Sequence, residues 1–169
     1  EEYKGQIHLI RAMGILINEY NYKNLKLYII GEGSLRGTLE NEIKGLNLEG
    51  IVFLLGKQIH KDVPVWVTAS DVFVLPSLSE SFGIVQIEAF ACGKPVVATK
   101  NEGSKEVVTA EKYGYLCEVG DPKDLAKKID KSLKNKWNKE KIIKYSNRFK
   151  QEEINKKLLE IYKKILDNN

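Results

Sequence analysis

The chain has 169 residues, with 27 lysines and arginines against 23 acids and a net charge of +4. This length predicts one domain with a proper core, and the apolar fraction of 43% is ordinary for a soluble globular protein. No apolar run approaches the ~20 residues of a membrane-spanning helix. Aromatic residues are not interleaved with basic ones, so a nucleic-acid-binding platform is not expected.

The cysteines and histidines exclude further classes. Cys92 and Cys117 both lie in apolar segments, which is typical of core thiols in a reducing compartment. His8 and His60 stand alone among residues that do not bind metals, so no metal site is expected. No secretory signal is recognised, and we expect a cytoplasmic protein. The mild positive charge is compatible with peripheral contact with an anionic membrane surface, but does not indicate it.

Apolar runs bounded by turn residues alternate with helical patterns along most of the chain. The expected strands are Leu27–Gly31, Ile51–Gly56, Val72–Pro76, Val96–Thr99 and Gly114–Glu118. The expected helices between them are Gln6–Glu19, Leu35–Lys44, Asp62–Ala69, Ile84–Ala91 and Lys105–Val108. Such alternation predicts βαβ units, and therefore an α/β fold with a parallel sheet covered by helices on both faces.

Two more helices are expected in the tail. The first is Leu125–Leu133, and the second is a long amphipathic helix, Glu152–Leu166. Four apolar residues of the long helix form one stripe: Ile154, Leu158, Ile161 and Ile165. The simplest interpretation is that this stripe docks on the same domain.

The helix that begins near Gly83 carries an unexpected acid. The helix is apolar almost all round and is therefore expected to be buried, yet Glu88 lies in its middle. Glu80 precedes the helix, with seven residues between the two acids. The free N–H groups of Phe82, Gly83 and Ile84 and the helix dipole predict an anion site. Two carboxylates beside an anion site suit a nucleotide or a sugar nucleotide; the alternative is that Glu88 reaches solvent and Glu80 is a loop charge.

A glycine-rich turn follows the first expected strand. Gly31 and Gly33 let the backbone approach a ligand closely, and Gly37 completes a loose dinucleotide-binding pattern. That pattern requires an acid after the next strand to hold a ribose, but the strand ends Leu55–Lys57 without one. Glu88 is then the available candidate for a ribose contact.

The run Glu80–Glu88, with Ala-Cys-Gly-Lys-Pro-Val-Val-Ala at 91–98, resembles the E-x7-E motif of retaining group 1 (family 4) glycosyltransferases. These enzymes have two domains and the GT-B fold. The resemblance covers essentially the whole chain and implies a single Rossmann-like, nucleotide-sugar-binding domain over residues 1–169. It corresponds to the C-terminal half of such an enzyme. It also implies that the first strand and the N-terminal domain are missing, and that the helix at about 152–166 crosses toward that domain.

The resemblance assigns roles to individual residues. It implies that Lys4 contacts the donor pyrophosphate and that Glu80 orients the donor sugar, and we take both as catalytic. Glu88 would hold the ribose hydroxyls, and the backbone of Gln58 the nucleobase. The full set of expected substrate-binding residues is Gly31, Gly33, Gln58, Ser81, Phe82, Gly83, Ile84 and Glu88. On the residues alone, Lys4 is an ordinary terminal lysine, and a bare loop at Gln58 is as good an interpretation as a base contact.

The implied reaction is sugar transfer from a nucleoside-diphosphate sugar, with retention of anomeric configuration and without a metal or cofactor. The acceptor, a glycan or a lipid, would bind largely to the N-terminal domain, so the isolated chain is expected to be inactive. Glu102 departs from the motif, since a glycine usually stands there, and its charge would lie near the donor site.

Three alternatives remain to be weighed. One is a nucleotide-binding module without chemistry, which turnover by the chain would exclude. Another is a sugar-nucleotide epimerase with the GT-B fold, against which the E-x7-E run argues. A receiver-type signalling domain would need an aspartate after the central strand, where this chain has Pro76 and Ser77.

Overall fold

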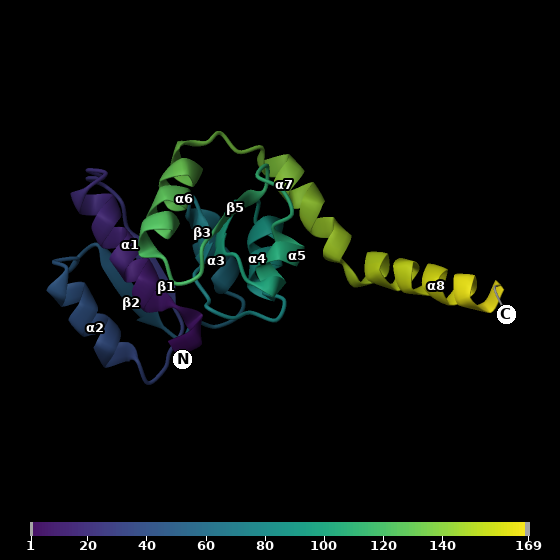
Figure 1. Cartoon of the computed structure of the whole chain (residues 1–169), viewed down its shortest axis with the longest axis horizontal. Coiled ribbons are helices and arrows are strands. Elements are labelled where there is room, and N and C mark those ends of the chain that lie inside the picture. The colour runs from purple at the N-terminus through teal and green to yellow at the C-terminus, as the bar shows by residue number, and fades with distance from the viewer. Residues whose placement is uncertain (1, 168–169) are drawn as a thin grey trace.

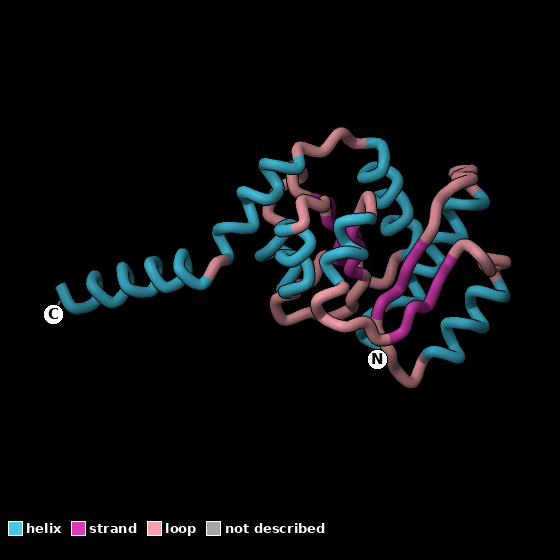
Figure 2. The backbone as a smooth tube through the Cα atoms, turned by 180° about the vertical axis from the view of Figure 1, so that it is seen from behind, coloured by secondary structure: helices cyan, strands magenta, loops and turns pink. Residues whose placement is uncertain are grey.

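The computed structural model describes residues 2–167 and contains two parallel sheets, seen in magenta in Figure 2. In the first sheet β1 (Leu27–Ile30) pairs with β2 (Val52–Gly56). In the second, β4 (Val96–Thr99) lies between β3 (Phe73–Leu75) and β5 (Gly114–Cys117). All three pairings are parallel, so the predicted α/β class with parallel strands is confirmed.

Helices surround these strands (Figure 1). They are η1 (Glu2–Lys4), α1 (Gln6–Asn18), α2 (Arg36–Gly45), α3 (Val63–Ala69), α4 (Ile84–Ala91), α5 (Glu102–Val107), α6 (Pro122–Lys134), α7 (Lys139–Ser146), η2 (Asn147–Phe149) and α8 (Gln151–Asp167). None of the helices described, from Glu2 onward, has both the length and the apolar character needed to cross a membrane.

Two apolar cores lie on opposite faces of the strands, as the side-chain alternation of β4 illustrates. Val97 packs into the core formed with α1, α2 and α6. Its neighbours Val96 and Ala98 pack into the other core, with α3, α4, α5 and α7. Because every residue of β4 is buried, this strand reads as a continuous apolar run rather than as an alternating one.

The strands form two sheets where one was expected. β1 and β3 each pair on one side only within the described residues, and no ladder joins them. Side chains of both strands nevertheless share a core, since Leu27 and Ile29 of β1 and Val74 of β3 belong to the same cluster.

Helix α5 begins at Glu102, three residues before its expected start. Asn101 caps it, because the side-chain oxygen of Asn101 accepts a hydrogen bond from the backbone N–H of Ser104 at 2.9 Å. A six-residue helix offers too little apolar periodicity to reveal its start, whereas the Asn-x-x-Ser cap pattern does so locally. The short helices η1, α7 and η2 were not expected at all.

Helix α8 extends away from the body of the molecule (Figures 1 and 2). Ile154, Leu158, Ile161 and Ile165 of its stripe are 45–54% exposed. The interpretation that this stripe docks on the same domain is therefore wrong. The helix itself was predicted correctly to within one residue at each end.

Of the two expected core thiols, Cys117 is buried and Cys92 only half-buried, and neither forms a disulfide. Burial raises the pKa of the Cys117 thiol to about 12, and the nearby carboxylate of Asp124 adds to this shift.

Candidate functional site

The loop after β3 carries Glu80, and the N-terminal segment lies directly against it. The backbone N–H of Leu78 donates to the carbonyl of Tyr3 at 2.7 Å. Gly5 adopts a left-handed conformation with φ of 67°, and a Cβ there would lie 2.0 Å from the carbonyl oxygen of Pro76. Only glycine fits both requirements, so this contact fixes the segment beside the loop.

Lys4 and Glu80, the two residues predicted to be catalytic, form an ion pair. The Lys4 Nζ lies 3.1 Å from Oε2 of Glu80, and their side chains are 34% and 16% exposed. The hydroxyl of Ser77 lies 3.5 Å from the same oxygen. The fold therefore brings together two charges separated by 76 residues of sequence.

Helix α4 opens beside this pair. Gly83 is its N-cap in a left-handed conformation, and no side chain of the described residues caps the helix. Ser81 and Ile84 are exposed and Phe82 is half-buried at this mouth. The N–H of Gln86 donates to the carbonyl of Gly83 at 2.9 Å, and no side chain occupies the other N–H groups of the first turn. The anion site at this helix start stays a prediction.

The structure corrects the reasoning about Glu88. Helix α4 is not buried all round, since Ile84 is 64% and Val85 41% exposed. Glu88 is half-buried, and its carboxylate has no hydrogen bond or ion pair among the residues described. A half-exposed acid does not need a ligand to satisfy it, so burial no longer argues for the ribose contact. That role rests on the motif.

The other predicted ligand-binding residues lie at the ends of β1 and β2. The N–H of Gly31 donates to the carbonyl of Gly56 at 2.9 Å, and a Cβ on Gly31 would meet open space. Gly31 and Gly33 line a small cavity of about 60 Å³, which Gln6 at the start of α1 also borders. The side chain of Gln58 donates to the carbonyl of Leu55 at 3.0 Å. These strand ends are where open α/β sheets bind ligands.

A buried polar cluster behind the Glu80 loop was not predicted. The side-chain amide of Asn101 donates to the carbonyl of Ser77 and to Thr99 Oγ1, both at 3.0 Å. The Thr99 hydroxyl donates to the same carbonyl of Ser77. These side chains are at most 9% exposed, and they anchor the start of the loop to the end of β4.

Helix α5 touches the loop at Gly103. Its N–H donates to the carbonyl of Glu80 at 3.2 Å, and a Cβ at this position would lie 2.6 Å from that carbonyl oxygen. Any side chain at Gly103 would displace the loop. The neighbouring Glu102 is exposed, with its carboxylate 2.6 Å from Lys105 Nζ, so Lys105 offsets its charge.

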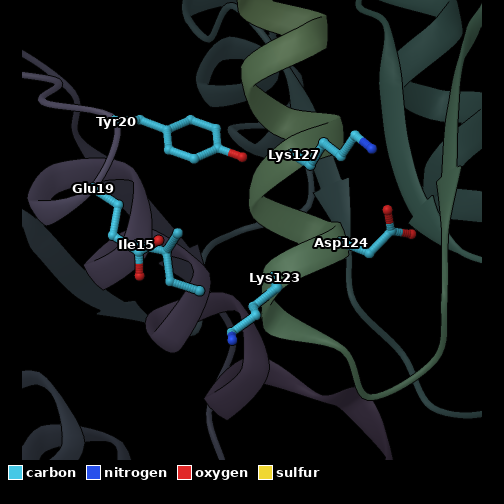
Figure 3. A pocket seen from close by; sticks show the side chains of 6 residues that line it. All are labelled: Ile15, Glu19, Tyr20, Lys123, Asp124 and Lys127. Atoms are coloured by element: carbon cyan, nitrogen blue, oxygen red, sulfur yellow. The ribbon is translucent and has the colours of Figure 1, made fainter.

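Another cavity, of about 350 Å³, lies between α1 and α6 (Figure 3). Its lining residues are Ile15, Glu19, Tyr20, Lys123, Asp124 and Lys127. None of them is a predicted site residue. Asp121 caps the N-terminus of α6 and accepts from the N–H groups of Lys123 and Asp124, so these donors are not free for an anion. Across residues 2–167 there is also no group of three or more potential metal ligands.

Comparison with known proteins identifies a family. The model of the family described as "Glycosyl transferases group 1" matches residues 1–168. N-acetyl-alpha-D-glucosaminyl L-malate synthase of Bacillus anthracis is 36% identical over 127 residues, which make up 75% of this chain and 32% of that protein. D-inositol 3-phosphate glycosyltransferase of Paenarthrobacter aurescens is 32% identical over 132 residues, 77% of this chain and 32% of that protein.

Solved structures of longer proteins have a similar fold. Sucrose-phosphate synthase from Thermosynechococcus elongatus superposes with a TM-score of 0.81 and 26% identity, over 100% of this chain and 44% of that chain. HepE of Anabaena in complex with UDP has a TM-score of 0.80 and 28% identity, over 97% and 46%. The chain thus spans about a third of the length of the two curated relatives.

Proposed function

Since the chain belongs to the group 1 glycosyltransferase family and has the fold of its GT-B members, we propose that it is the donor-binding half of a retaining enzyme. The enzyme would transfer a sugar, of hexose type, from a nucleoside-diphosphate sugar to a glycan or lipid acceptor. The observation that carries this proposal is the Lys4–Glu80 ion pair beside the open mouth of α4.

The diphosphate would bind where positive charge and free N–H groups meet. Lys4 and the first turn of α4 supply both, and they would stabilise the leaving group as its negative charge grows. The glycines at the end of β1 add a position where a ligand can approach the backbone. No metal or cofactor enters this scheme.

The two acids would take different parts of the donor. Glu80 would orient the sugar hydroxyls and Glu88 would hold the ribose, with the nucleobase beside Gln58. In the retaining reaction, the departing phosphate would assist deprotonation of the acceptor hydroxyl on the face it leaves. Glu80 then positions and stabilises the sugar but does not act as a nucleophile.

The acceptor would bind to a partner domain, because curated relatives are about three times as long as the matched region. We propose that α8 packs against that domain through its exposed stripe. Such an enzyme would work in the cytoplasm on polysaccharide or glycolipid synthesis, and peripheral membrane contact is compatible with its charge.

A nucleotide-holding module without transferase activity is the second candidate. The chain matches only 32% of the length of the Bacillus anthracis relative, and this favours the module interpretation for the isolated chain. In this scheme the acceptor would bind to the part of the enzyme outside that match. An epimerase of the GT-B fold is disfavoured by the Glu80–Glu88 spacing. Release of free or transferred sugar from a nucleotide sugar by the 169-residue chain would exclude the passive module.

The test is nucleotide binding by the 169-residue chain. Thermal shifts with UDP, GDP and ADP should select one base, and HepE, which was solved with UDP, makes UDP the first probe. Glu88→Ala should then weaken UDP binding about tenfold in calorimetry, because one charged hydrogen-bonding group is lost. Glu49→Ala, at an exposed acid outside the site, is the matched control. Equal UDP affinity of the Glu88 variant and the unmodified chain would refute the ribose role.

A further inference from the structure

Helix α4 contains a buried polar side chain that the scheme above does not use. Gln86 is 0% exposed, and its Nε2 donates to the hydroxyl of Ser104 at 3.2 Å. Ser104, in the first turn of α5, is also 0% exposed. The side-chain carbonyl of Gln86 is buried without a hydrogen-bond partner among the described residues.

The Gln86 amide lies directly under the turn that joins Glu80 to α4. A Cβ on Gly83 would lie 2.1 Å from Gln86 Nε2 and 3.2 Å from Cγ of Glu80. On the other side, Ser104 follows Gly103, whose N–H holds the carbonyl of Glu80. The Gln86–Ser104 bond therefore ties together the two helix starts that hold this turn, α4 and α5.

This contact is costly for stability. A leucine at position 86 would fill a similar volume without burying an unpaired carbonyl, and unpaired buried acceptors destabilise a fold. The Gln86 amide instead fixes the distance between the start of α4 and the start of α5, because its N–H group donates to Ser104.

We propose that Gln86 and Ser104 are positioning residues that set where Glu80 stands relative to the mouth of α4. This inference rests on the proposed function, in which the mouth holds the diphosphate and Glu80 holds the sugar. The Gln86–Ser104 pair would then fix the position of the sugar-binding subsite relative to the phosphate-binding subsite. Without the Gln86–Ser104 bond, each subsite would still bind its own part of the donor. The two subsites would be less well placed to bind one nucleotide-sugar molecule at the same time.

The decisive measurement is the preference of the 169-residue chain for UDP-glucose over UDP, by calorimetry. Gln86→Leu removes one unpaired buried carbonyl but leaves the buried Ser104 hydroxyl without its partner, so the Tm should change little. The variant should bind UDP as tightly as the unmodified chain. Its preference for UDP-glucose should fall roughly fivefold, the equivalent of about one net hydrogen bond. Ser132→Ala, which removes another buried serine hydroxyl far along the chain in α6, should leave that preference unchanged.

A second variant separates positioning from folding. Ser104→Ala should lower the Tm, because it leaves both polar atoms of Gln86 unpaired. Adding Gln86→Leu to Ser104→Ala should restore the Tm, but not the preference for UDP-glucose. A Gln86→Leu protein with the full preference would overturn the inference while leaving the proposed function intact. An unmodified chain that binds none of UDP, GDP and ADP, either free or as nucleotide sugars, would overturn both.

Discussion

At the scale of single residues, Lys4 would interact with two negatively charged groups, the carboxylate of Glu80 and the diphosphate of the donor. In the proposed scheme Lys4 serves the diphosphate, but in the structure it also faces the Glu80 carboxylate at 3.1 Å. In the same scheme, the Glu80 carboxylate would hold the donor sugar, but its negative charge would also repel the incoming diphosphate. The diphosphate and Glu80 would therefore compete for Lys4. When the sugar hydroxyls bind to Glu80, this carboxylate would have another partner and Lys4 could turn to the diphosphate.

Neutralising Glu80 should consequently strengthen the binding of the bare nucleotide. We expect Glu80→Gln to bind UDP up to about fivefold more tightly, since a partly exposed ion pair is worth ~1 kcal/mol at most. Lys4→Ala should have the opposite effect. Calorimetry at low and at high salt measures both, and the gain should shrink as salt screens the charges. Weaker UDP binding by Glu80→Gln would show that Glu80 does not oppose the diphosphate.

Tyr22 provides a pH-dependent contact between the loop after α1 and helix α6. Its hydroxyl donates to Asp130 Oδ1 at 2.9 Å. Burial, followed by the hydrogen bond to Asp130, raises the pKa of Tyr22 from 10.0 to about 12. A raised pKa stabilises the folded state fully below pH 10, and this stabilisation is lost as the pH rises from 10 toward 12.

Substituting Tyr22→Phe should therefore lower the free energy of unfolding at pH 8 and have progressively less effect above pH 10. Urea unfolding of both proteins at pH 8, 10 and 11.5 measures the difference. Other groups that titrate in this range, such as Cys117, affect both proteins equally. A difference between the two proteins that stays constant from pH 8 to 11.5 would contradict this account.

At the scale of elements, the pattern of apolar runs predicted the strands and the long helices but not how exposed each would be. All five strands were placed within two residues at each end. The exposure of α4 was misjudged because an all-apolar sequence does not say which of its faces a neighbour covers. The Lys4–Glu80 pair could not be derived from spacing, because only the left-handed turn at Gly5 brings the N-terminal segment to the loop.

Helix α8 should add little to the stability of the rest of the molecule. Its apolar residues remain about half exposed, so little area is buried when it forms. We expect a chain that ends at Lys150 to unfold within a few degrees of the full chain, measured by circular dichroism. Trypsin should also cut first at the lysines of α8. A large drop in Tm would instead show that the helix folds back onto the body in solution.

At the scale of the whole molecule, the two cores and the divided sheet explain which predictions could be made. Residues 96–98 alternate between the two cores, and this layered order follows from the sequence pattern. The division into two sheets does not, because pairing depends on which strands become neighbours in space. The family membership accounts for the likeness to larger enzymes, of which this chain matches less than half.

The unpaired flanks of β1 and β3 also affect how the chain behaves when it is handled alone. Among residues 2–167 no strand pairs with these flanks, and backbone groups on such an edge can pair with an extended peptide. At high concentration, the peptide most readily available is another molecule of the same protein. Dilute samples, or an added strand-forming peptide that occupies these groups, should therefore limit self-association and precipitation.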